Sequence, residues 1–207
     1  MLDCRTLEYE LVAIPPNVRM VVCNSTVRRE LATGEYNLRR ADCESGVKSL
    51  QSFLPGIRAL RDVALADLEK YKSALSPTVF RRCRHVITEN QRVLDAVKAL
   101  EVSNCARLGR LMCESHTSLR DDYSVSCDEL DLLVNLASSM SGIYGARMMG
   151  GGFGGCTVNL LRSDAVAAFQ ANIARMYAEK TGMTPEIYAS EPAQGASVWP
   201  SEGDLDG

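Results

Sequence analysis

The stretch Gly150-Gly151-Gly152-Phe153-Gly154-Gly155 places five of the fifteen glycines of this chain in six consecutive positions. Glycine has no Cβ and loses more conformational freedom on folding than other residues, so the cluster predicts positive φ angles or a close approach of the backbone to another group. Successive backbone amides of this kind can form an anion-binding concavity, commonly for a phosphate. A tight turn where two backbones cross would need the same glycines, so the run alone leaves both interpretations open.

The residues that follow the glycine run alternate in polarity, as they do along a β-strand. Cys156, Val158 and Leu160 would face one side, and Thr157 and Asn159 the other. The run is therefore predicted to be the turn of a strand–loop–strand unit. Its spacing matches G-x-G-x-x-G, but a dinucleotide-binding motif must open a helix, and the Gly-Lys-Ser/Thr of a Walker loop is also missing. A glycine-rich hairpin beside nucleotide phosphates, as in the protein kinases, fits the pattern.

Length and composition place the chain among ordinary globular proteins. Its 207 residues can enclose one substantial core, or one domain with a remnant of another, and 46% are hydrophobic and 24% charged. The formal net charge is −3 and no block of lysine and arginine is present, so we expect no nucleic-acid partner. No apolar run approaches the roughly 18 residues of a membrane-spanning helix, and no signal peptide precedes the start. We therefore expect no membrane partner and a cytoplasmic location.

The cysteines and histidines do not form a metal-binding pattern. None of the eight cysteines belongs to a C-x-x-C pair, and most occupy apolar positions of predicted helices and strands. His85 and His116 lie far apart without ligand spacing. We therefore predict reduced, buried cysteines that pack as small apolar residues, and no metal site.

Hydrophobic periodicity predicts strands at both ends of the chain and a block of helices between them. Strand patterns cover residues 18–23 and 185–189, with a further candidate at 195–199. Helical patterns cover residues 37–53, 65–75, 77–100, 104–112, 126–137 and 163–182. The helix signals are the N-caps Ser76, Asn104 and Ser163, the capping box Ser126-Cys127-Asp128-Glu129 and a C-terminal Gly182. This order predicts an α+β fold compatible with a ferredoxin-like sandwich, with the helical block inserted between sheet strands and a frayed tail at 201–207.

Three segments together resemble the galactokinases, members of the GHMP kinase superfamily, which also contains homoserine, mevalonate and phosphomevalonate kinases. The segments are residues 34–40, 114–123 and 147–156. The resemblance extends over nearly the whole chain. It implies that residues 16–200 form the C-terminal domain of a GHMP kinase, and that residues 1–15 are a remnant strand of an N-terminal domain whose remainder is missing.

The resemblance also implies roles for single residues. In galactokinases the third segment lies beside the nucleotide-phosphate loop, so Gly150 to Gly155, with Phe153, would support the phosphate end of ATP. Tyr36, by itself a half-buried anchor before a helix, matches a tyrosine that contacts the sugar. A phenol suits that role because it can hydrogen-bond a hydroxyl while its ring covers an apolar sugar face. The family's catalytic aspartate and arginine lie upstream of the matched part, so no catalytic residue and no metal ligand is expected here.

Three further residues, Arg28, Arg120 and Asp121, are candidates for supporting roles. The run Arg120-Asp121-Asp122 could suggest paired acids for proton transfer or magnesium binding. The resemblance instead favours a structural role, in which Arg120 braces the glycine hairpin and an aspartate serves as a cap or ion-pair partner. Met149 stands where the family usually has threonine, a change that removes a hydroxyl beside the phosphates.

The resemblance implies ATP-dependent phosphorylation of galactose, or of a close sugar, at the C1 hydroxyl, with ATP and Mg²⁺ as cofactors of the complete enzyme. We expect the chain alone to be inactive, and its partner to be the N-terminal half, supplied covalently or as a separate chain. Self-association through the interface that this half would cover is the other expected contact. The alternative hypothesis is a non-catalytic galactokinase-like module that senses a sugar or nucleotide, or binds a partner.

Overall fold

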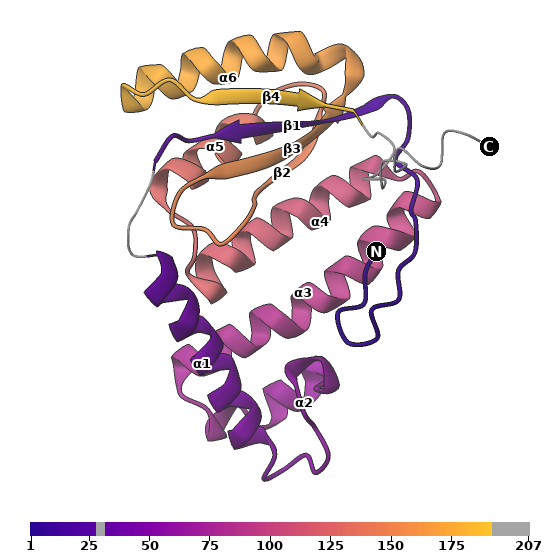
Figure 1. Cartoon of the computed structure of the whole chain (residues 1–207), viewed down its shortest axis with the longest axis vertical. Helices are drawn as coiled ribbons and strands as arrows, with labels where there is room; N and C mark the ends of the chain where they lie inside the picture. The colour runs from indigo at the N-terminus through magenta and orange to yellow at the C-terminus, as the bar shows by residue number, and fades with distance from the viewer. Residues whose placement is uncertain (28–31, 192–207) are drawn as a thin grey trace, which may run out of the picture.

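The fold is built on an antiparallel β-sheet (Figure 1). The computed structural model describes residues 1–27 and 32–191, and within them the sheet has four strands in the order β2-β3-β1-β4. The strands are β1 (Val18–Asn24), β2 (Ile143–Met148), β3 (Cys156–Arg162) and β4 (Glu186–Ser190). Because all neighbours are antiparallel in this order, the sheet is ferredoxin-like, and the predicted α+β fold is confirmed.

Most of the helical structure lies between β1 and β2, as the predicted insertion requires. The helices are α1 (Ala32–Leu50), α2 (Leu65–Lys70), α3 (Pro77–Glu101), α4 (Cys105–Ser118), α5 (Asp128–Ser138) and, after β3, α6 (Val166–Thr181). In Figure 1, α4 runs beside the sheet, while α3, α1 and α2 extend away from it as a helical lobe. Among the described residues, no helix combines the length and apolar character needed to cross a bilayer.

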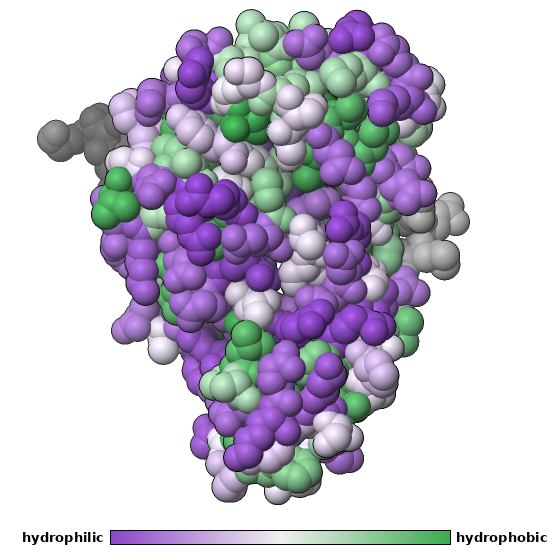
Figure 2. Space-filling view, turned by 180° about the vertical axis from the view of Figure 1, so that it is seen from behind, coloured by the Kyte–Doolittle hydropathy of each residue, from purple (hydrophilic) through white to green (hydrophobic). Residues whose placement is uncertain are grey.

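Helices cover both faces of the sheet. Leu160 and Leu161 are neighbours in β3 and therefore point to opposite faces. Leu161 packs with α5 and α6 in the main core, which includes Phe169 and Ile173. Leu160 packs with Cys105 and the other apolar side chains of α4. The helical lobe has a separate core, built from Leu50, Leu60, Val63, Leu68, Phe80, Cys83 and Ile87. The surface seen from behind is mainly polar, with apolar side chains in small scattered groups (Figure 2).

Strand β3 has the predicted alternation, but its polar side faces the main core. Thr157 and Asn159 are fully buried, whereas Cys156 and Val158 are half-buried. Burying an amide is costly unless it is hydrogen-bonded. The Asn159 side chain meets this need in part, because Nδ2 donates to the Val21 carbonyl at 2.9 Å and to the Thr157 hydroxyl at 3.3 Å.

Three of the predicted helix signals are confirmed. Ser76 and Asn104 accept hydrogen bonds from the backbone at Val79 and Arg107, at 3.2 and 3.0 Å. Gly182 ends α6 in the left-handed conformation with a φ of 72°.

Two other signals are wrong. The Ser126 hydroxyl donates to the carboxylate of Asp131 at 2.5 Å instead of capping α5, whose N-cap is Cys127. Ser163 opens a short 3₁₀ turn, and α6 begins only at Val166. Ser126 is thus used for a contact with Asp131, and Ser163 is part of a separate turn before the helix.

The predicted remnant strand at residues 1–15 is replaced by a tight turn with one isolated bridge between Leu2 and Tyr9. The Asp3 N–H donates to the Glu8 carbonyl at 2.9 Å, and the Asp3 carboxylate pairs with Arg61 of the helical lobe at 2.7 Å. A strand needs a neighbour along its length, and no described residue provides one here. The candidate strand at 195–199 and the tail at 201–207 lie outside the described residues.

Helix α4 touches strand β2 with no side chain between the two backbones. A Cβ on Gly109 of α4 would lie 1.9 Å from the Tyr144 carbonyl oxygen, and one on Gly145 of β2 would lie 2.1 Å from the Gly109 carbonyl oxygen. These two glycines therefore set how closely the helical block approaches the sheet.

We predict that Gly109→Ala lowers the free energy of unfolding by about 3 kcal/mol, because the backbone of β2 cannot move aside as a side chain can. Gly34→Ala in α1 is the matched control, since a Cβ there meets nothing within 4 Å. Its better helix propensity should add about 0.5–1 kcal/mol. Chemical denaturation measures both changes, and a Gly109→Ala variant as stable as the wild type would contradict the close contact.

Candidate functional site

The glycine run forms the loop between β2 and β3, as predicted. Four of its glycines have positive φ angles: Gly150 (75°), Gly152 (85°), Gly154 (123°) and Gly155 (82°). Phe153 also has a positive φ, of 60°, which is uncommon for a residue with a bulky side chain. A strand follows the loop, so the loop does not open a helix, and the exclusion of a dinucleotide-binding motif is confirmed.

Two other segments of backbone cross this loop. A Cβ on Gly152 would lie 2.1 Å from the Val125 carbonyl oxygen, and one on Gly154 would lie 2.5 Å from that of Val27. The same two carbonyls accept hydrogen bonds from the loop, Val125 from the Phe153 N–H at 2.8 Å and Val27 from the Gly155 N–H at 3.2 Å. The interpretation as a crossing of backbones is therefore confirmed.

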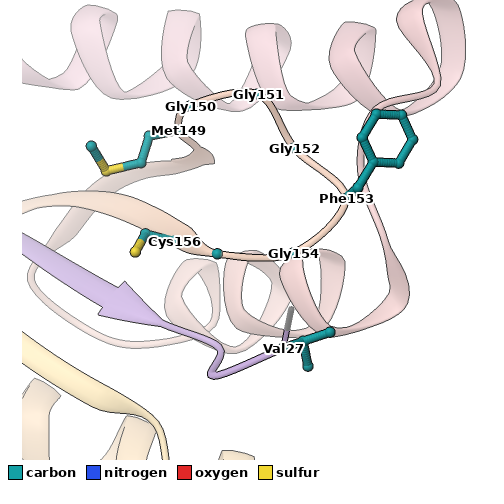
Figure 3. A pocket seen from close by; sticks show the side chains of 9 residues that line it. Val27, Met149, Gly150, Gly151, Gly152, Phe153, Gly154 and Cys156 are labelled. Atoms are coloured by element: carbon teal, nitrogen blue, oxygen red, sulfur yellow. The ribbon is translucent and has the colours of Figure 1, made fainter. Parts of the chain in front are cut away.

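The crossing leaves part of the loop free to bind a ligand. The Met149 N–H donates to the Cys156 carbonyl at 2.9 Å and closes the loop. No described residue accepts a hydrogen bond from the N–H groups of Gly150, Gly151, Gly152 or Gly154. These four glycines line a hollow of about 550 Å³, together with Val27, Met149, Phe153, Gly155 and Cys156 (Figure 3). None of the lining side chains is acidic, so the arrangement suits an anion such as a phosphate.

The first turns of α1 approach the loop from the side of Phe153. The Arg39 guanidinium lies over the Phe153 ring, with Cζ 5.8 Å from the ring centroid. Tyr36, three residues earlier on the same helix, has a side chain that is 60% exposed. It does not line the hollow, but positions three apart on a helix are neighbours, so the phenol lies on the helix face beside Arg39. Its contact with a sugar stays a prediction.

The other predicted supporting residues lie elsewhere. Arg28 is outside the described residues. Arg120 pairs with Asp121 at 2.7 Å on the surface and does not line the hollow at residues 149–156. Its predicted contact with the glycine hairpin stays a prediction. These two residues belong to a π-helical turn, Leu119–Tyr123, whose buried side chains are those of Leu119 and Asp122, and positions 120 and 121 therefore face solvent. Asp122 forms an ion pair with Arg84 and accepts a hydrogen bond from Ser118.

Two histidines are buried among the helices, and one of them, His116, connects α4 to the end of β2. His116 Nδ1 accepts a hydrogen bond from the Met148 N–H at 3.3 Å, and His116 Nε2 lies 3.1 Å from the Asp131 carboxylate. Burial lowers the pKa of His116, against the opposing effect of Asp131. Burial also lowers the pKa of His85 to about 4, and its ring stacks on Tyr123 with centroids 4.5 Å apart. Both imidazoles are therefore neutral at pH 7.

The cysteines are all free. Cys23, Cys83, Cys105 and Cys127 are buried, and burial raises the pKa of the Cys23 and Cys83 thiols to about 12, as expected for inert apolar packing. Cys4 is an exception to the predicted burial, because it lies in the exposed N-terminal turn. Among the described residues, no group of three or more histidine, cysteine or acidic side chains is placed to hold a metal ion.

Comparison with known proteins shows which families this chain is similar to. Residues 96–179 match the family model described as GHMP kinases C terminal. The chain is 46% identical over 195 residues to the galactokinase of Roseiflexus sp. (strain RS-1), covering 94% of the chain and 50% of the relative. It is 48% identical over 203 residues to the galactokinase of Chloroflexus aggregans, covering 98% of the chain and 52% of that relative. The chain thus spans about half the length of the curated relatives it matches.

Solved structures agree with this match. The Lactococcus lactis galactokinase complexed with galactose superposes with a TM-score of 0.86 at 35% identity, over 91% of this chain and 49% of that one. The L. major mevalonate kinase in complex with R-mevalonate reaches a TM-score of 0.52 at 19% identity, over 90% and 46% of the two chains. The second likeness shows the fold alone.

We predict that Gly152→Ala distorts the loop, because the new Cβ meets the Val125 carbonyl and the φ of 85° strains any L side chain. The loss should be about 2 kcal/mol of unfolding free energy, within the range for overpacking and backbone strain. Gly151→Ala is the control: no positive φ is present there and its Cβ meets nothing within 4 Å. Thermal unfolding and amide NMR shifts of the loop measure the difference. Equal behaviour of the two variants would contradict the described loop geometry.

Proposed function

We propose, for a chain that carries a GHMP kinase C-terminal domain and matches the C-terminal half of galactokinases, that it forms half of an enzyme which phosphorylates galactose with ATP. The domain would comprise residues 16–200. The observation that carries the proposal is the set of free backbone N–H groups around the hollow at residues 149–156. The cytoplasmic location stays a prediction.

The chemistry that this half would contribute is electrostatic. In the proposed reaction the γ-phosphorus leaves the bridging oxygen of ADP and forms a new bond to the C1 oxygen of the sugar, whose hydroxyl proton passes to a base outside this chain. Negative charge shifts onto the phosphate oxygens during this transfer, and fixed N–H donors stabilise it without reorganisation. Because the lining side chains carry no negative charge, nothing in the hollow opposes a triphosphate.

The magnesium ion that accompanies ATP is assigned to no residue of this chain. The described residues offer no cluster of ligands for it. Its ligands would come from the nucleotide, water and the other half of the enzyme.

We assign the sugar contact to Tyr36. The Lactococcus enzyme was solved with galactose, and Tyr36 lies on the helix whose Arg39 covers the edge of the glycine loop. Its phenol is 60% exposed and therefore available to a ligand. A close relative of galactose would be bound by the same chemistry.

We assign the contact with the other half to the N-terminal segment and the groove beside it. Leu7, Tyr9 and Leu11 are 72%, 75% and 89% exposed, which is unfavourable for apolar side chains in water. A groove of about 890 Å³ runs between residues 1–4, residues 60–65 and the middle of α3, and Leu65 and Leu94 in its wall are also exposed. An apolar patch of this kind typically marks a protein contact. Self-association would use the same surface.

The decisive experiment is a coupled ATP-consumption assay with galactose. It compares this chain alone, the chain mixed with the N-terminal half of the Roseiflexus galactokinase, and the covalent fusion of the two. We expect turnover only in the mixture or the fusion. Robust turnover by the chain alone would contradict the need for a second half. A folded, associated mixture and fusion without activity would favour a non-catalytic sensing or interaction module.

In the active fusion, Tyr36→Phe should raise the galactose KM about fivefold, from the loss of one hydrogen bond worth about 1 kcal/mol. Tyr188→Phe is the control, because that phenol is also exposed but lies on β4 and donates to Glu186. Steady-state kinetics in both substrates measures the effect. An unchanged galactose KM for Tyr36→Phe would remove this residue from the sugar site.

A further inference from the structure

We propose that Arg39 and Arg82 are positioning residues for the glycine loop. The buried Arg82 and the partly buried Arg39 hold residues 122–124, an arrangement that we call the arginine clamp. The next residue, Val125, carries the carbonyl that fixes the Gly152–Phe153 turn. The consequence for nucleotide affinity rests on the proposed function, whereas the consequence for the shape of the loop does not.

Arg39 reaches from α1 to two consecutive carbonyls. Its Nε donates to the Tyr123 carbonyl at 2.8 Å and its Nη2 to the Ser124 carbonyl at 2.9 Å. Its Nη1 pairs with Glu35 at 3.0 Å, and the side chain is only 11% exposed. A guanidinium presents its donors in a rigid planar fork, which suits two neighbouring acceptors.

Arg82 reaches the same segment from α3. Its Nη1 donates to the Asp122 carbonyl and, at 2.8 Å, to the Ser124 hydroxyl. Asp42 of α1 lies 3.7 Å from Nε, and the Arg82 side chain is 8% exposed. Because removing one partner of a buried charge is costly, the bonds of Nη1 and the nearby Asp42 carboxylate restrain the guanidinium, although Nε itself has no hydrogen-bond partner among the described residues.

The segment that the two arginines hold, residues 122–124, is followed directly by Val125, whose carbonyl contacts the loop. The carbonyls of Asp122, Tyr123 and Ser124 are taken by the two arginines, and the next carbonyl, that of Val125, accepts the Phe153 N–H. Ser124 has a φ of 53°, so the chain reverses there and aims the Val125 carbonyl at the loop. Arg39 therefore acts on Phe153 twice, through this carbonyl and through the ring beneath its guanidinium.

The clamp matters because the loop contains a strained residue. Phe153 has a φ of 60°, a conformation that persists only where the surroundings impose it. Release of the Val125 carbonyl would let Phe153 return to a negative φ and would turn the neighbouring free N–H groups away from the hollow. The arginines would thus set the direction of the anion-binding donors without touching the anion.

The test compares Arg39→Ala and Arg39→Lys with Arg40→Ala in this chain. Arg40 is the next residue on the same helix, but its side chain is 72% exposed and pairs only with Glu44 among the described residues. The rate of amide hydrogen exchange at Phe153 measures local opening of the Gly152–Phe153 turn. The rate at Val21, in the centre of the sheet, measures global unfolding. Titration with sodium tripolyphosphate, followed by the loop amide signals, reads anion binding.

We expect Arg39→Ala to accelerate exchange at Phe153 about tenfold or more, as two charge-assisted hydrogen bonds are lost, with exchange at Val21 nearly unchanged. Arg39→Lys keeps the charge over the ring but not the double donation, so its effect should be intermediate. Tripolyphosphate affinity should fall in the same order, and Arg40→Ala should match the wild type.

Unchanged exchange at Phe153 in Arg39→Ala would overturn the proposal, as would equal acceleration at Phe153 and Val21. If Arg39→Ala does not fold, Arg39→Lys decides by the same criteria. A wild-type chain that does not bind tripolyphosphate would refute the phosphate role of the loop. The exchange measurements would then still decide whether the clamp exists.

Discussion

At three places in this protein two segments of backbone approach so closely that a Cβ atom has no room. Gly109 meets Tyr144 between α4 and β2, Gly152 meets Val125, and Gly154 meets Val27. The first contact fixes the helical block against the sheet, and the other two fix the loop against the segments before α1 and α5. Interiors are densely packed and transmit strain, so these contacts determine the relative positions of sheet, helices and loop.

The hydrogen bonds of the glycine loop meet two opposed requirements, one from folding and one from ligand binding. A stable loop needs its polar backbone groups satisfied, whereas an anion site needs N–H groups that are free. Here the donors at Met149, Phe153 and Gly155 are used internally, and those of Gly150, Gly151, Gly152 and Gly154 are not used by any described residue. The internal bonds hold the loop in place, while the residues with the remaining donors line one hollow.

Much of this could be predicted from the sequence, and the exceptions have physical reasons. The periodicity of residues 156–160 and the glycine run predicted the hairpin, because both are local patterns. Local polarity could not show that the side of β3 carrying Asn159 faces the core, since that depends on the distant Val21 carbonyl. Arg39 and Arg82 were missed for the same reason: on a helix an arginine looks solvent-facing, and their acceptors lie about 40 to 85 residues away. Arg120 was given a bracing role instead because it belongs to the segment 114–123 that resembles the galactokinases, yet it pairs with its neighbour Asp121 on the surface.

The contacts that shape the loop all come from described residues of this chain, which bears on how the proposed enzyme would work. Val27, Val125, Arg39 and Arg82 hold the loop without any group from another half. The donors for the phosphate would therefore be in place before the halves meet, and little binding energy would be spent on ordering them. The described residues offer free N–H donors at the loop and no group of three or more histidine, cysteine or acidic side chains placed to hold a metal ion. In the proposed enzyme the other half would supply the base and the protein ligands of magnesium. If the proposed enzyme divides its site in this way, its activity would depend on the docking of the two halves, whereas its affinity for phosphate would depend on this chain.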